Sequence, residues 1–242
     1  MRSLTNAHGC CDHHAKLRLG VISSTDGSTF DALVEITRNL PLEWHLITDR
    51  QCGVEGVASR HRIPTSRIEE RENHAFCAKA ASVLKHEGID AVLLLFWRLV
   101  TAEVFSEFPT FNLHPSLLPE FPGLDAVTRA RASGAGVVGA TLHVVSETMD
   151  QGRILAQTRD TADARWPEAA WMRVSFRQRV RLAVYLIDSL LASRKNPTAT
   201  SRLRELPAAV PITNIALRDA GLARAANAWI EKNAPLQTVP LR

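Results

Sequence analysis

Two polar residues, Asn112 and His114, stand on either side of a leucine in FNLHPSLLP, residues 111–119. Alternate side chains of an extended chain point to opposite faces, so Asn112 and His114 share one face. A proline disfavours the helical conformation of the residue before it, which places the pair at the end of a strand. An amide and an imidazole together could stabilise an oxyanion and handle a proton. By itself, however, the segment fits better with a turn-capping asparagine and a hydrogen-bonded loop histidine.

A second polar segment follows about forty residues later. GATLHVV, residues 139–145, predicts a strand, and ETMDQG, residues 147–152, predicts the turn after it. The chain returns to an extended pattern at residues 154–156. Asp150 therefore lies in a turn between two predicted strands, where its carboxylate is available to a site.

These segments together resemble the folate-dependent formyltransferase family. The resemblance rests on NLHPSLLP, FPGL (residues 121–124), GATLH and MDQG, and it extends from about residue 17 to residue 191. The most specific signal is Asn-x-His-Pro-Ser followed by a later Asp-x-Gly. The resemblance implies transfer of a formyl group from 10-formyltetrahydrofolate to a small-molecule amine, with glycinamide ribonucleotide of purine biosynthesis as the leading acceptor.

The resemblance assigns catalytic roles to three residues. Asn112 and a protonated His114 would donate hydrogen bonds to the oxyanion that forms when the amine attacks the formyl carbon. Asp150 would keep His114 charged and relay the amine proton through water. Neither a covalent intermediate nor a metal is required. Supporting hydrogen bonds are expected from Ser116 and Thr141. His143 matches a supporting position of the family, although a histidine in a strand more often has a structural role.

The folate pocket is expected after the buried strand at residues 91–96. Parallel sheets bind ligands at the carboxyl ends of their strands, and this strand delivers Trp97, Arg98, Leu99 and Val100 there. The resemblance assigns these four residues, with Asn112 and Asp150, to the folate. Alternatively, Trp97 belongs to the core and Arg98 is a solvated or ion-paired strand end.

Two segments are expected to bind the acceptor amine. The first is the loop at residues 23–29, whose free backbone amides and helix dipole favour an anion; Gly27, Ser28 and Thr29 match the phosphate-binding positions of the family. Asp26 departs from the family pattern, because its charge opposes a phosphate unless it points outward.

The second acceptor segment is the predicted helix at residues 174–192. Gln178 aligns there with a glutamate of the family that contacts the amine substrate, and Arg177, Arg179 and Arg181 surround it. These changes keep other acceptors open, such as an amino sugar or a secondary-metabolite amine.

Strands and helices alternate through the first half of the chain, which predicts an α/β fold with a Rossmann-like, doubly wound, mostly parallel sheet. No Gly-x-Gly-x-x-Gly follows the first strand, so a dinucleotide has little support. We expect a tail at residues 1–16, a catalytic domain at 17–193, and a linker with a C-terminal helical extension at 194–242. The predicted elements are strands 17–22, 43–49, 63–65 and 91–96 and helices 54–62, 69–87 and 216–232.

Composition excludes several classes of protein. The formal net charge is +4 and there is one tyrosine, so a nucleic-acid partner lacks both a basic stripe and a stacking set. No apolar run approaches the roughly 20 residues that span a bilayer, and no signal peptide is seen. The four cysteines form no disulfide framework in their spacing, which favours a reducing cytoplasm. The Cys/His cluster of residues 8–14 matches no standard zinc motif, so no metal is expected.

Two alternatives to formyl transfer remain from the sequence. A 10-formyltetrahydrofolate hydrolase is one, but that branch usually carries an N-terminal regulatory domain, for which residues 1–16 leave no room. A non-catalytic folate-binding module is the other, and it has no need of Asn112, His114 and Asp150 together. The sequence leaves the oligomeric state open, with a homodimer as one assembly.

Overall fold

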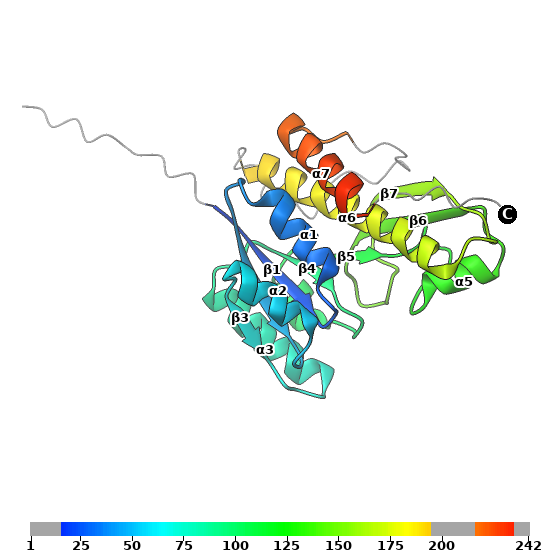
Figure 1. Ribbon diagram of the computed structural model, residues 1–242. Helices are drawn as coiled ribbons and strands as arrows, with labels where there is room; N and C mark the ends of the chain where they lie inside the picture. The colour runs from blue at the N-terminus through cyan, green and yellow to red at the C-terminus, as the bar shows by residue number, and fades with distance from the viewer. Residues whose placement is uncertain (1–15, 195–215, 235–242) are drawn as a thin grey trace, which may run out of the picture.

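The computed structural model describes residues 16–194 and 216–234, and in this part the chain forms a seven-stranded sheet (Figure 1). The strand order is β3-β2-β1-β4-β5-β6-β7, which starts at β1 and winds outward in both directions. The first five strands run parallel, as predicted, and β6 and β7 are antiparallel. The strands are β1 (Leu17–Ser23), β2 (Leu42–Thr48), β3 (Thr65–Arg67), β4 (Ala91–Leu95), β5 (Thr110–His114), β6 (Val137–Val144) and β7 (Ile154–Thr161).

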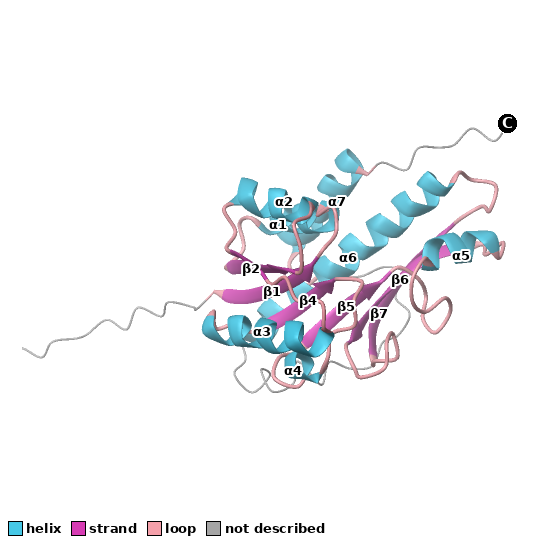
Figure 2. Cartoon of the chain, turned by 90° about the horizontal axis from the view of Figure 1, so that it is seen from below, coloured by secondary structure: helices cyan, strands magenta, loops and turns pink. Residues whose placement is uncertain are grey.

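Helices cover both faces of this sheet (Figure 2). Helices α1, α2, α6 and α7 lie on one face and α3 and α4 on the other, which confirms the predicted doubly wound α/β fold. Helix α5 packs against α6 and β6 in a smaller apolar cluster. The helices are α1 (Ser28–Thr37), α2 (Gly53–His61), α3 (Asn73–His86), α4 (Ala102–Phe105), α5 (Ala126–Ala132), α6 (Glu168–Arg194) and α7 (Ala220–Asn233).

The central strands are apolar on both faces because each face meets helices. In β4, Leu93 packs in the core beneath α1 and α6, and the next residue, Leu94, packs in the core beneath α3. This double burial explains the continuous apolar run that predicted the strand. In β5 only one face is apolar: Phe111 and Leu113 join the first core. Asn112 and His114 therefore point to the opposite face, as the alternation predicts.

The antiparallel pairing of β5 with β6 brings the polar residues together. Asn112 pairs with His143 and His114 with Thr141 in this ladder. The loop that connects β6 to β7 carries Asp150. Strand register therefore aligns residues about thirty positions apart on one face of the sheet.

Several element boundaries differ from the prediction; the final helix, expected at residues 216–232, is found at Ala220–Asn233. The helix expected from residue 69 begins at Asn73, because the Glu72 carboxylate accepts hydrogen bonds from the amides of His74 and Ala75 and caps the helix there. The short strand expected at residues 63–65 is found at Thr65–Arg67, where it pairs with β2.

The C-terminal helix α7 packs against α1 and α6. Buried Asp188 of α6 accepts hydrogen bonds from the amides of Arg218 and Asp219 at the start of α7. Buried Arg177 donates through Nη1 to the Ala234 carbonyl at its other end, at 2.6 Å. Polar contacts thus fix both ends of α7. The Cys/His cluster of residues 8–14 lies outside the described residues.

Candidate active site

A cavity of about 400 Å³ opens at the edge of the sheet where β1, β4 and β5 end. Parallel strands in a doubly wound sheet deliver their carboxyl ends to this edge, where such folds bind ligands. The walls come from the β1–α1 loop, the segment after β4, the end of β5, the β6–β7 loop and α6. The polar lining residues include Asn112, His114, His143, Asp150, Asp26, Ser28, Thr29 and Arg179.

Asp150 is the centre of the polar contacts in the cavity. Its side chain is 6% exposed, and Oδ2 accepts a hydrogen bond from the Gly123 amide at 2.7 Å. The same oxygen lies 3.2 Å from His114 Nδ1, and Oδ1 lies 3.4 Å from Asn112 Nδ2 and 3.5 Å from His143 Nε2. Burial disfavours the charge of Asp150, but the hydrogen bonds from His114 and from the Gly123 amide outweigh this effect and hold the pKa of Asp150 well below its ordinary value.

Both ring nitrogens of His114 face hydrogen-bond acceptors. Nε2 donates to the Phe121 carbonyl at 2.9 Å, and Nδ1 faces the carboxylate of Asp150. A carbonyl and a carboxylate can only accept, so a doubly protonated imidazolium satisfies both contacts. The ring is also buried, with 4% of the side chain exposed. The contacts of both ring nitrogens therefore fit a charged pair of His114 with Asp150 inside the cavity.

A chain of hydrogen bonds orients Asn112. His143 Nδ1 lies 3.0 Å from the Val144 carbonyl, which can only accept, so this nitrogen carries the ring proton. His143 Nε2 is then an acceptor, and Asn112 Nδ2 donates to it at 3.1 Å. The second hydrogen of Nδ2 has only the longer contact, 3.4 Å, to Asp150. His143 therefore supports Asn112 directly. The pairing of β5 with β6 shows this contact, whereas the spacing of the two residues in the sequence does not.

Ser116 and Thr141 hold the turn that follows β5. Thr141 Oγ1 donates to the Ser116 carbonyl at 2.7 Å and accepts from the Leu118 amide, while Ser116 Oγ donates to the Glu120 carbonyl at 2.6 Å. Gln157 of β7 adds a donor to Thr141 Oγ1 at 2.9 Å. These contacts keep the Phe121 carbonyl against His114.

Gly152 allows the Asp150 loop to lie against β6. A Cβ atom on Gly152 would lie 1.6 Å from the Val144 carbonyl oxygen, a distance that the backbone cannot accommodate. Asp150 itself has a left-handed backbone, with φ of 57°, in the same loop. The glycine of the Asp-x-Gly motif is thus explained by a close backbone approach.

We expect Gly152→Ala to displace the loop and to lower formation of product by at least about a hundredfold, because Asp150 would leave His114. The measurement is initial rate together with the midpoint of thermal unfolding. Gly136→Ala is the matched control, since nothing lies within 4 Å of a Cβ at that position. Equal rates for the two variants would show that the loop tolerates the displacement.

The comparison with known proteins adds a family to this geometry. A protein-family model described as formyl transferase matches residues 17–169, more than half of the chain. The chain belongs to the formyl transferase family. It is therefore a folate-dependent formyltransferase, and 10-formyltetrahydrofolate is its formyl donor.

Relatives of this formyltransferase come from several bacteria. Phosphoribosylglycinamide formyltransferase of Bacillus subtilis is 33% identical over 152 residues, which cover 58% of this chain and 77% of that protein. The Mycobacterium tuberculosis protein of the same name is 34% identical over 151 residues, which cover 59% and 70%. The crystal structure of glycinamide ribonucleotide transformylase 1 from Symbiobacterium toebii superposes with a TM-score of 0.66 at 29% identity, covering 71% of this chain and 85% of that one.

In this formyltransferase the segment after β4 lines the cavity with Trp97, Arg98, Leu99 and Val100, and its contact with folate stays a prediction. Trp97 is half exposed, and the Arg50 guanidinium lies 5.1 Å from the centre of its ring. Trp97 is therefore a rim residue, and its interpretation as core is wrong.

Arg98 lines the same cavity, but its guanidinium is already paired. It contacts Asp49 at 3.0 Å and donates to Asn73 Oδ1 and to the Glu70 and Arg71 carbonyls. Arg98 thus anchors the segment before α3, as the alternative interpretation of the sequence has it. Any contact of this segment with folate falls to its backbone and to its neighbours.

The β1–α1 loop meets the cavity through Ser28 and Thr29, whereas Gly27 is buried behind them as the left-handed N-cap of α1, with φ of 89°. The Asp26 carboxylate accepts hydrogen bonds from the Ser28 amide and hydroxyl at 3.1 and 3.0 Å. Asp26 therefore points toward the helix N-terminus, whereas phosphate binding there requires that it point outward. Its carboxylate already uses one of the amides that a phosphate would take.

Gln178 does not reach the cavity. Its side chain is buried, and Nε2 donates to Asp160 of β7. The assignment of Gln178 to the acceptor pocket is contradicted by this position, because a helix turns by about 100° per residue and the next side chain, Arg179, lines the cavity instead. The helical pattern alone could not show which of the two positions faces the ligand.

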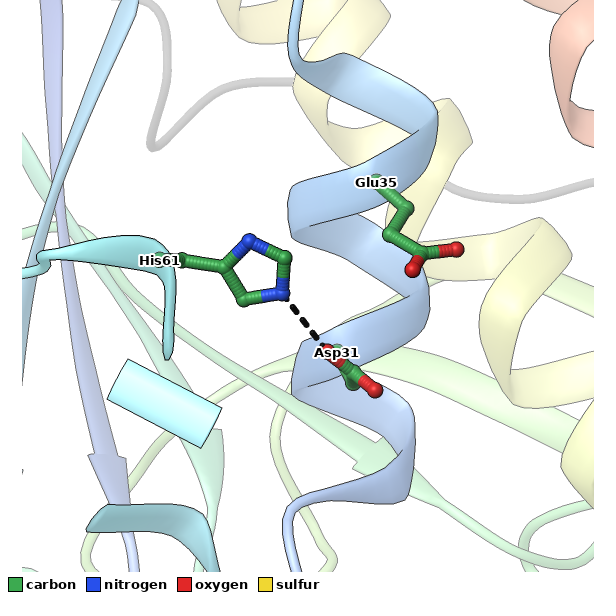
Figure 3. Close-up of side chains that lie close together, drawn as sticks. All are labelled: Asp31, Glu35 and His61. Atoms are coloured by element: carbon green, nitrogen blue, oxygen red, sulfur yellow. Dashed lines mark hydrogen bonds and ion pairs between the residues drawn. The ribbon is translucent and has the colours of Figure 1, made fainter. Parts of the chain in front are cut away.

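Among the described residues, one group of three side chains has metal-binding donors close together: Asp31, Glu35 and His61 (Figure 3). His61 Nε2 lies 2.7 Å from Asp31 Oδ1, and Asp31 Oδ2 pairs with Arg60 at 3.1 Å. Glu35 accepts from the indole of Trp229. These partners account for the group as a polar contact between α1, α2 and α7. It lies outside the residues that line the cavity.

Proposed function

We propose that this formyltransferase transfers the formyl group to a small-molecule amine, with glycinamide ribonucleotide of purine biosynthesis as the leading acceptor. The observation that carries the proposal is the convergence of Asn112, His114 and Asp150 in the cavity. The names of the relatives support the acceptor.

Within the described residues, no helix has the length and apolar character needed to cross a bilayer.

The catalytic step requires stabilisation of an oxyanion. When the neutral amine attacks the formyl carbon, negative charge develops on the formyl oxygen, and preorganised donors lower the barrier most effectively at that point. Asn112 Nδ2 would exchange its long contact to Asp150 for this oxygen while His143 holds the amide in place.

His114 would act chiefly through its positive charge. Both of its N–H groups already have acceptors, so the direct hydrogen bond to the oxyanion that the sequence predicts requires the ring to leave the Phe121 carbonyl. A buried imidazolium stabilises a nearby oxyanion even without that contact, since the surroundings screen it weakly.

Asp150 would remove the proton from the amine nitrogen through water, after the nitrogen becomes cationic. Because its pKa is held well below the ordinary value, Asp150 stays charged at neutral pH and can accept the hydrogen bond from His114 Nδ1. A strongly acidic carboxylate is a weak base, so its role is to accept a proton from an ammonium intermediate.

The test is a spectrophotometric assay of tetrahydrofolate release from 10-formyltetrahydrofolate, with and without glycinamide ribonucleotide. Acceptor-dependent release is the expected result. Release at the same rate without acceptor would identify a hydrolase. Folate binding without turnover would agree with 10-formyltetrahydrofolate as the donor and indicate a different acceptor amine. The Asp26 carboxylate at the α1 N-terminus is the observation that favours such an acceptor. A chain that binds folate and transfers to no amine would be a binding module.

We also propose that residues 17–193 form the catalytic domain and that residues 194–242 form a linker and helical extension. The contacts of α7 with α1 and α6, on the face of the sheet away from α3, support an extension that packs on the catalytic domain (Figure 2). A cytoplasmic location and a homodimer remain predictions of the same proposal.

A further inference from the structure

Three arginines of α6 lie two residues apart and have three different environments. A helix turns by about 200° over two residues, so Arg177 and Arg181 share one face and Arg179 lies opposite. Arg177 contacts the end of α7, and Arg181 Nη1 lies 3.7 Å from Asp160 of β7. Only Arg179 among the three lines the catalytic cavity.

The Arg179 guanidinium lacks a partner in the described part of the chain. Its Nε is buried without a hydrogen bond, and no hydrogen bond or ion pair joins this side chain to another described residue. A buried charge with unsatisfied donors is costly, and arginine carries five N–H donors. Burial also lowers the pKa of Arg179, and the charge of Asp26 only partly opposes this effect. The side chain is therefore prepared for an anion from outside the protein.

The facing wall of the cavity cannot supply that anion. Asp26 is the acidic residue whose charge acts on Arg179, but its carboxylate is held by the Ser28 amide and hydroxyl, and no ion pair to Arg179 forms. Ser28 and Thr29 add neutral side chains to the same wall. An anion bound between the walls would meet a free guanidinium on α6, and the Asp26 charge would push it toward α6.

We propose that Arg179 binds an anionic group, phosphate or carboxylate, of the acceptor amine and so determines which amines the enzyme accepts. This inference rests on the proposed formyl transfer to a small amine. The planar guanidinium fork matches both groups with two parallel hydrogen bonds, so the chemistry is shared. The anion site is thereby placed on α6, whereas the sequence predicts it at Gly27, Ser28 and Thr29.

The first test measures anion binding to the full chain by calorimetry, with inorganic phosphate in one arm and acetate in the other. Arg179→Gln is expected to weaken binding of the preferred anion by about ten- to a hundredfold, the effect of losing one charged hydrogen-bonding partner. Arg181→Gln is the matched control, since it removes the same charge from the same helix outside the cavity; a change of less than about threefold is expected. The preferred arm identifies the group as phosphate or carboxylate.

The second test is kinetic and uses glycinamide ribonucleotide. The KM for the acceptor should rise in Arg179→Gln by a similar factor, while the KM for 10-formyltetrahydrofolate stays within about twofold, because a merely structural role would affect both. Equal anion binding by Arg179→Gln and the wild type, or no binding of either anion by the wild type, overturns the inference. Anion binding that depends on Arg179 without turnover of glycinamide ribonucleotide supports the inference and removes only that acceptor.

Discussion

Replacing Asp150 by asparagine is expected to lower kcat for formyl transfer by about 10²–10⁴-fold, the usual range for a catalytic acid or base. The amide keeps the size of the side chain but removes the charge that faces His114 at 3.2 Å. It also cannot accept a proton from the attacking nitrogen. The measurement is acceptor-dependent release of tetrahydrofolate at saturating substrates.

Asp163→Asn is a suitable control for this variant. Asp163 is also a carboxylate with a lowered pKa, about 2, caused by hydrogen bonds from Arg165, but it lies outside the residues that line the cavity. Its rate should remain within about twofold of the wild type, as for most surface changes. A similar rate for Asp150→Asn would remove Asp150 from the mechanism.

The pH dependence follows from the lowered pKa of Asp150. A carboxyl whose pKa is lower in the folded than in the unfolded chain stabilises the fold above its ordinary pKa of about 4 and loses this contribution as the pH falls further. The destabilisation by Asp150→Asn should therefore be largest near pH 7 and smaller near pH 3, as measured by denaturant unfolding. In the wild type, loss of activity between pH 7 and pH 5 should not come from protonation of Asp150.

Replacing Asn112 by alanine is expected to lower kcat by about 10²–10³-fold, because the variant lacks the oxyanion donor that we propose. The KM for 10-formyltetrahydrofolate should change far less, since the contact with the formyl oxygen strengthens in the transition state. Steady-state kinetics with each substrate varied separates the two effects.

His143→Ala distinguishes a donor from its support. His143 contacts Asn112 at 3.1 Å and orients its amide, so its removal should lower kcat by less than the loss of Asn112 itself. The double variant should be little worse than Asn112→Ala, because the two residues act through one hydrogen bond. Additive losses would indicate that His143 acts on the substrate by a separate route.

Local pattern was sufficient to predict the shared face of Asn112 and His114. Strand alternation places two residues on one side whenever they stand two positions apart, and the apolar neighbours show which side is the core. The same logic predicted the buried strand β4. The family resemblance added Asp150, whose approach to His114 depends on a loop that no periodicity describes.

Other features of the site required the three-dimensional structure. The partners of His114 include the Phe121 carbonyl, and a backbone carbonyl carries no signature in its residue type. The exchange of Gln178 for Arg179 as the cavity residue is a shift of one position on a helix, smaller than the error of an alignment at low identity. Arg98 follows strand β4 at the cavity, yet its guanidinium turns to Asp49 and Asn73, which lie far away in sequence.

The attachment of α7 makes the extension and the catalytic layer a single cooperative unit. Leu222, Ala226 and Ile230 bury one stripe of α7 in the core that also contains α1 and α6. A chain ending after α6 would expose the apolar surface of α1 and α6 that this stripe covers. It would also deprive buried Arg177 of its hydrogen bond to the Ala234 carbonyl. Heating should therefore unfold both parts in one transition. Destabilising substitutions in α7 would lower the rate of formyl transfer because they lower the fraction of enzyme that is folded.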